Sequence, residues 1–82
     1  MAEYNGHESR HHWNVSLWLN NDESLYGMAR EVASSFTDTK RAAACFVRMM
    51  GDFEMEKTPD GYAYTVETVE PVIAELMEEI EE

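Results

Sequence analysis

The stretch that decides the fold prediction is residues 53–66, which read Phe-Glu-Met-Glu-Lys-Thr-Pro-Asp-Gly-Tyr-Ala-Tyr-Thr-Val. At its centre, Pro59 supplies a fixed φ, Asp60 a side-chain hydrogen bond to the backbone and Gly61 a positive φ, which together favour a tight turn. Apolar residues alternate with polar ones on both sides of this turn, at Phe53, Met55, Tyr62, Tyr64 and Val66. Alternation has the period of a strand, so the stretch predicts a β-hairpin.

A helical pattern follows the predicted hairpin. An apolar stripe with the spacing i, i+3, i+4, i+7 and i+11 predicts a last helix, which Thr68 caps and which carries Pro71 in its first turn. The residues of this stripe are Val69, Val72, Ile73, Leu76 and Ile80.

Two more helices are predicted before the hairpin. Asp22 caps the first, which covers residues 23–36. The second follows a cap at residues 37–39 and stops near Gly51. Its apolar stripe consists of Ala42, Cys45, Phe46, Met49 and Met50. We expect the methionines to fill the core and not to line a promiscuous groove.

Residues 9–20 are compatible with two structures. Trp13, Val15, Leu17 and Leu19 alternate as in a strand, although Trp18 breaks the alternation. A helix that begins near Ser9 is the other interpretation. The periodicity alone slightly favours the strand.

Together these elements predict a small α+β domain, with about three to four helices packed against one β-hairpin over residues 53–66. A length of 82 residues allows one domain, so residues 1–82 are taken as a single acidic globular unit. Residues 1–8 are expected to be loosely ordered. The aromatic and methionine content provides enough core material to argue against intrinsic disorder.

Charge divides the chain unevenly. Seventeen acids against six bases give a net charge of −11, and residues 49–82 hold eleven of the acids but only one base, Lys57. Phosphate binding requires Lys and Arg, so the composition argues against direct nucleic-acid binding and favours a basic protein surface as the partner. No apolar run approaches the roughly 20 residues of a membrane span, and no signal-peptide pattern opens the chain. The lone Cys45 excludes an intramolecular disulfide, and a cytoplasmic location is predicted.

Four glutamates share one outward face of the last predicted helix, at the spacing i, i+3, i+4 and i+7. They are Glu75, Glu78, Glu79 and Glu82. Like charges at this spacing repel each other, and acids in a last turn oppose the helix dipole, so the row has a small folding cost. The functional interpretation is a docking face for a basic surface that normally holds phosphates. The alternative is a solvated face that keeps the protein soluble.

Three more glutamates extend this negative surface in the prediction. Glu54 and Glu56 alternate on the outward side of the hairpin, and Glu67 follows it. The alternative role for charges on the hairpin is protection of an edge strand against aggregation, which does not exclude the first role.

Signals for catalysis or metal binding are sparse. His7 and His11 lie four residues apart, which suits two ligands on one helical face, and His12 is adjacent. No further ligand completes a zinc motif, so no metal or cofactor is expected and the histidines are read as exposed. Cys45 is expected to be a small buried hydrophobe, because no His or Asp completes a relay beside it. With so many acids, carboxylate pairs arise from composition alone and do not indicate an acid–base pair. The sequence also has no phosphate loop and no nucleophile motif, so it predicts no enzyme.

Residues 12–26 read His-Trp-Asn-Val-Ser-Leu-Trp-Leu-Asn-Asn-Asp-Glu-Ser-Leu-Tyr. This run resembles a signature of small phage- and prophage-borne proteins, in which Trp-Asn-Val-x-Leu-Trp-Leu-x-Asn-Asp-Glu-x-Leu-Tyr opens the domain. The resemblance implies a phage origin and favours a helix for residues 9–20. The signature often carries Glu-Thr where this chain has His11-His12, so nothing rests on those two positions. In size and charge the chain also resembles anti-CRISPR inhibitors, several of which occupy DNA-binding surfaces of CRISPR effector complexes.

These observations predict a phage-encoded inhibitor of a host defence complex, of the anti-CRISPR type. It would bind a basic DNA-binding surface of a CRISPR effector complex and block target DNA in the cytoplasm of the host bacterial cell. The predicted partner-binding residues are Glu54, Glu56, Glu67, Glu75, Glu78, Glu79 and Glu82. The alternatives are a phage interaction module that binds another protein, or itself, without DNA mimicry, and a small hydrolase or metal-dependent protein.

Overall fold

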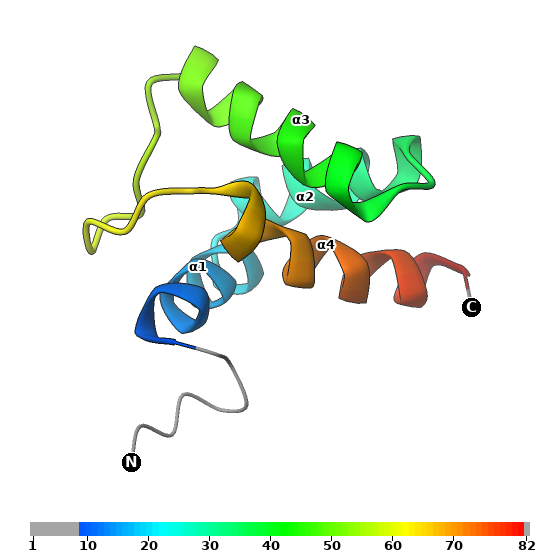
Figure 1. Ribbon diagram of the computed structural model, residues 1–82, viewed down its shortest axis with the longest axis horizontal. Coiled ribbons are helices and arrows are strands. Elements are labelled where there is room, and N and C mark those ends of the chain that lie inside the picture. Colours follow the sequence, from blue (N-terminus) through cyan, green and yellow to red (C-terminus); the bar gives the residue numbers. More distant parts are fainter. Residues whose placement is uncertain (1–8, 82) are drawn as a thin grey trace.

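Four α-helices make up most of residues 9–81, which are the residues that the computed structural model describes (Figure 1). They are α1 (Arg10–Asn21), α2 (Glu23–Ser35), α3 (Thr39–Asp52) and α4 (Val66–Glu81). Helix α4 packs against each of the other three, and α2 also packs against α1 and α3. In Figure 1, α3 lies above α4, and the connection between them swings out on the left. The fold is all-α, so the predicted α+β class is wrong.

A loop stands in place of the predicted hairpin. Lys57 and Ala63 form an isolated antiparallel bridge, and residues 9–81 contain no strand. The tight turn itself does form, because the Gly61 N–H donates to the Thr58 carbonyl at 2.8 Å and Gly61 has a φ of 95°. The turn therefore forms, with the expected positive φ at Gly61, but the Asp60 carboxylate accepts from the Asn14 and Trp18 side chains in place of the expected backbone bond. The alternating residues beside the turn do not form strands.

The end of α3 takes up residues that the hairpin would need. The helix continues past Gly51, where the sequence predicts a stop, and ends at Asp52. Two backbone hydrogen bonds close the helix. The Met55 N–H donates to the Met50 carbonyl at 2.8 Å, and the Glu54 N–H donates to the Gly51 carbonyl at 3.1 Å. This is a Schellman arrangement, in which one residue takes a left-handed conformation that usually falls to glycine. Here Glu54 takes it, with a φ of 59°.

Helix α4 begins earlier than the sequence predicts. Thr65 and Thr68 cap each other: Thr65 Oγ1 accepts the Thr68 N–H at 3.2 Å, and Thr68 Oγ1 accepts the Thr65 N–H at 3.1 Å. This reciprocal pair satisfies two N–H groups at the start of the helix, as a capping box does. Pro71 consequently lies inside α4 and not in its first turn. Without an N–H, Pro71 cannot bond the Glu67 carbonyl four residues earlier.

The segment over residues 9–20 forms helix α1, which runs from Arg10 to Asn21, and not a strand. The Ser9 Oγ accepts the His12 N–H at 3.2 Å and caps α1. Val15 and Leu19, one turn apart, are fully buried, whereas Leu17 is only half-buried. The alternation that favoured a strand is therefore coincidental, and the other interpretation, a helix that begins near Ser9, is confirmed.

The two middle helices match the predicted ones. Asp22 caps α2 by accepting the Leu25 N–H at 3.1 Å, and Asp38 caps α3 by accepting the Lys40 N–H at 2.9 Å. All four helices contribute to one core, in which Tyr64 of the loop packs edge-on against Phe46. The largest fully buried side chains are Phe46, Leu19, Met50, Ile73, Leu76, Val15 and Val69.

Candidate functional site

Four of the predicted partner-binding glutamates lie on one helix and face the solvent. Glu67, Glu75, Glu78 and Glu79 are all exposed on α4. At 100° per residue they cover the side opposite the buried stripe of Val69, Ile73 and Leu76. The last turn of α4 contains no base. We call these four residues the acid row of α4; Glu82 lies outside the described residues.

Glu70 differs from the acid row although it lies on the same helix. It is only half-buried, and its Oε2 accepts a hydrogen bond from the Thr39 Oγ1 at 2.6 Å. This bond links α4 to the start of α3, so Glu70 has a structural role.

The structure places Glu54 and Glu56 outside helix α4. Both are exposed, but Glu54 closes the end of α3 and Glu56 lies in the loop before α4. The acid row extends from Glu67 to Glu79 over about 18 Å, at 1.5 Å per helical residue, away from that loop. Protection of an edge strand is not their role, because residues 9–81 contain no strand.

The histidines of the described segment have structural partners. The His11 Nε2–H donates to the Ala63 carbonyl at 2.6 Å, and its ring lies 5.4 Å from the Tyr62 ring. The His12 Nδ1 lies 2.9 Å from the Ser9 Oγ. His7 lies outside the described residues. Among residues 9–81, no group of three or more His, Cys, Asp or Glu side chains is arranged to hold a metal ion.

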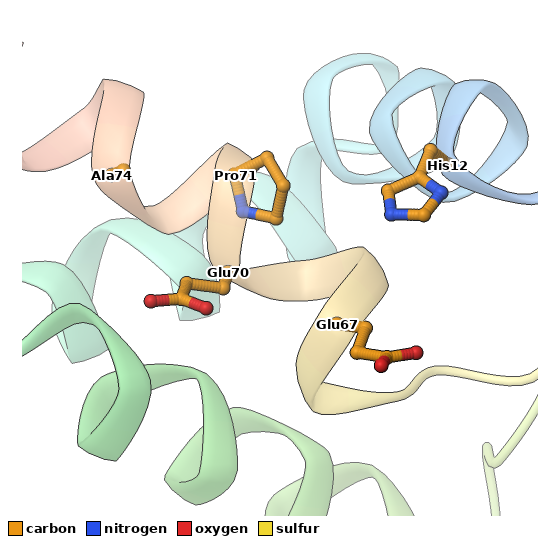
Figure 2. A pocket seen from close by; sticks show the side chains of 5 residues that line it. All are labelled: His12, Glu67, Glu70, Pro71 and Ala74. Atoms are coloured by element: carbon orange, nitrogen blue, oxygen red, sulfur yellow. The ribbon is translucent and has the colours of Figure 1, made fainter. Parts of the chain in front are cut away.

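His12 also borders a groove of about 500 Å³ on α4 (Figure 2). Glu67, Glu70 and Pro71 form the other side of this groove. Figure 2 shows the Glu67 carboxylate on the side of His12 and the Glu70 carboxylate turned toward α3. The two carboxylates therefore diverge and do not form an acid–base pair.

A buried polar contact between α1 and the loop is absent from the sequence predictions. Asn14 and Thr58 are each 3% exposed, and the Thr58 Oγ1 donates to the Asn14 Oδ1 at 2.7 Å. The Asp60 Oδ2 accepts two more hydrogen bonds, from the Asn14 Nδ2 at 2.8 Å and from the Trp18 Nε1 at 3.0 Å. We call these four residues, with the His11–Ala63 bond, the α1 seam.

Asp60 shows the electrostatic effect of the α1 seam. The hydrogen bonds from Asn14 and then Trp18 stabilise its carboxylate and lower its pKa from the ordinary value of 3.8. In this chain, Asn14 and Trp18 therefore serve to dock the turn. The spacing of residues 11, 14 and 18 along one helical face was the signal available in the sequence.

A second groove, of about 440 Å³, lies beside the α1 seam. Its apolar walls include Trp18, Leu25, Met55, Pro59 and Tyr64. Asp22 and Glu54 contribute carboxylates to it, and Lys57 contributes an ammonium group. Burial, and then the charge of Asp22, raise the pKa of the Tyr64 phenol above 10.0. We call this feature the Trp18 groove.

Two basic side chains of α3 line a groove away from the acid row. Arg41 and Arg48, two turns apart, line a groove of about 510 Å³ together with Phe36, Ala44 and Cys45. Cys45 is half-buried and packs against the core from its edge, so it is less buried than the sequence predicts.

No helix within residues 9–81 is long and apolar enough to cross a membrane. No curated protein and no solved structure matches the chain. A family model does match it, over residues 1–82. The chain therefore belongs to the family of unknown function DUF7249.

Proposed function

We propose that this chain is a binding protein that covers a basic, DNA-binding surface of a CRISPR effector complex with the acid row of α4, and so blocks target DNA. The observation that carries the proposal is the row itself: four exposed carboxylates on one helix, with no base in its last turn. The row extends over about 18 Å, which corresponds to roughly five phosphates at 3.4 Å per strand step. A surface that holds a DNA strand through Lys and Arg presents matching charges at that scale.

The folding cost of the row supports a binding role. Glu75 repels both Glu78 and Glu79, three and four residues away, and each such pair costs about 0.2–0.5 kcal/mol. Lys or Arg at the last-turn positions would stabilise α4, because cations favour the negative end of the helix dipole. A partner with a basic surface recovers that cost on binding, and the attraction also speeds encounter.

An inhibitor of this kind acts in the cytoplasm of the host bacterial cell. It carries out no reaction and requires no cofactor, since its effect comes from occupying a surface. The phage origin that the signature of residues 12–26 implies belongs to the same proposal.

The test is capture of purified CRISPR effector complexes, with and without target DNA, at low and at high salt. Binding that DNA competes away and that salt weakens is the expected result, because exposed charge pairs are screened. Binding that is indifferent to DNA and to salt contradicts the proposal, as does the absence of binding to every complex.

A pair of matched variants assigns the contact to α4. The double variant Glu75→Lys/Glu79→Lys reverses two charges in the acid row, and Glu23→Lys/Glu31→Lys reverses two exposed charges on α2. Both change the net charge by the same amount. The first is expected to abolish capture and the second to preserve most of it. Equal losses would mean that only the overall charge matters.

A second candidate function is an interaction module that uses an apolar contact without DNA mimicry. It is favoured by two exposed apolar side chains at the end of α3, Phe53 at 55% and Met55 at 40% exposure. Large exposed apolar side chains can mark interaction sites. The variant Phe53→Ser/Met55→Ser discriminates the two functions, since it should end binding in this case and spare it in the first.

A further inference from the structure

The Trp18 groove combines aromatic walls with carboxylates. Trp18 contributes the accessible aromatic surface, behind which Tyr64 is buried at 6% exposure, and Met55 contributes an exposed thioether chain. Its volume of about 440 Å³ falls in the range that accommodates a ligand or a long side chain. The groove therefore offers an apolar surface and negative charge within one small space.

Both aromatic walls are held in place before anything binds. The Trp18 Nε1–H donates to the Asp60 Oδ2 at 3.0 Å, which fixes the indole plane. The Tyr64 ring packs edge-on against Phe46, with 6.0 Å between ring centroids. A guest would therefore bind without the entropic cost of ordering these rings.

The charges of the groove select the sign of the guest. The Asp22 Oδ1 accepts the Leu25 N–H, and a carboxylate has acceptor sites beyond that one bond. Glu54 is exposed, and its left-handed conformation at the end of α3 sets the direction of its side chain. Lys57 is the opposing charge in the lining and lowers the net negative charge to one.

We propose that the Trp18 groove receives an arginine side chain of a partner protein. The guanidinium would lie on the Trp18 face and donate to Asp22 and Glu54, while its aliphatic stem would contact Met55. Arginine suits this site better than lysine, because its planar fork pairs with carboxylates through two hydrogen bonds and stacks on aromatic rings. The inference does not depend on the acid row of α4, because none of its four residues lines this groove.

The direct test uses N-acetyl-arginine amide as the probe and follows the two tryptophan indole N–H signals of the full chain by NMR. The Trp18 signal is expected to shift on titration, and the Trp13 signal is an internal control, since Trp13 does not line the groove. The citrulline analogue has the same shape without the charge and is expected to leave Trp18 unmoved. Equal shifts with citrulline, or no shift with arginine, would overturn the proposal. A lysine analogue that binds as tightly would overturn the assignment to arginine.

Three neutralising variants on the same loop sharpen the test. Glu54→Gln is expected to lower the affinity for N-acetyl-arginine amide by up to about fivefold, and Lys57→Gln to raise that affinity by a similar factor. Glu56→Gln removes an equally exposed charge that does not line the groove and is expected to leave the affinity unchanged. If Glu54→Gln and Glu56→Gln weaken the probe equally, the probe responds only to the general negative field and the groove is not a site. These outcomes are separate from capture of an effector complex, so the two proposals can fail independently.

Discussion

The α1 seam and the acid row of α4 use polar residues in opposite ways. In the seam, Asn14 and Thr58 are buried and bonded to each other, and Asp60 accepts from both Asn14 and Trp18. In the acid row, four carboxylates are exposed on a single helix, three of them within residues 75–79. The seam therefore uses polarity to determine structure, whereas the row has a small cost in stability and leaves its charge accessible to a partner. Substitutions should lower stability in the first region and raise it slightly in the second.

The largest effect is expected for Asn14→Ala in the α1 seam. This change removes the acceptor of the buried Thr58 hydroxyl and one donor to Asp60, and an unsatisfied buried polar group costs about 1–3 kcal/mol. Chemical denaturation measures the loss. Asn20→Ala is the control, because Asn20 is exposed and bonds only to Ser16 in its own helix. Equal losses for the two variants would show that the buried contacts of the seam stabilise the fold no more than an exposed hydrogen bond within a helix.

A gain in stability is expected for Glu54→Gly at the end of α3. A left-handed conformation costs a non-glycine residue about 1–2 kcal/mol, and the greater freedom of glycine in the unfolded chain offsets about 0.5–1 kcal/mol of the gain. The net increase in the free energy of unfolding is therefore up to about 1.5 kcal/mol, which thermal unfolding can detect. Glu56→Gly is the control, because Glu56 does not have a positive φ. Among residues 9–81, Glu54 is the only non-glycine residue that does. A lower melting temperature for Glu54→Gly would contradict the account of the α3 terminus.

A smaller gain is expected for Glu78→Lys in the acid row. The change relieves repulsion from Glu75 and places a cation near the end of α4, which together contribute about 0.3–1 kcal/mol at low salt. The gain should shrink at high salt, because the groups are exposed. Glu23→Lys makes the same charge change in the first turn of α2, where it should destabilise. Urea midpoints at two salt concentrations test both signs, and two shifts of the same sign would refute the dipole argument.

The smallest effect is expected from the titration of Asp60, which is exposed. Hydrogen bonding lowers the pKa of Asp60 in the folded state. Its contribution to the free energy of unfolding is therefore fully present above pH 3.8 and is lost as the pH falls through the folded pKa. Asp60→Asn removes this contribution. The difference in the free energy of unfolding between the two proteins should be constant above about pH 5 and shrink below 3.8. A difference that stays constant down to pH 2 would exclude the hydrogen-bonded carboxylate as its source.

The same comparison explains how far the sequence could predict the molecule. Helices α2 and α3 follow from caps and apolar stripes, which are local signals. The hairpin prediction failed because the residues on either side of the turn belong to helix ends. The backbone N–H groups of Glu54 and Met55 close α3, and those of Thr65 and Thr68 are bonded in the cap of α4. The alternation of Tyr62 and Tyr64 is therefore not the mark of a strand. Three members of the acid row, Glu75, Glu78 and Glu79, follow from helical spacing, whereas Glu67 joins it because α4 begins before the predicted Thr68 cap. The seam and the Trp18 groove join residues distant in the chain, and no local pattern indicates such partners.

The sequence separation across the α1 seam has a consequence for folding kinetics. Its side-chain contacts join residues 42, 44 and 46 positions apart, so they close long loops. Closing such loops requires entropy to be lost before the contacts form, whereas the α1–α2 and α2–α3 pairs meet through short connections. We therefore expect the seam to form after the transition state. Seam variants should then accelerate unfolding and leave the rate of folding almost unchanged, so the seam would control how long a folded molecule persists.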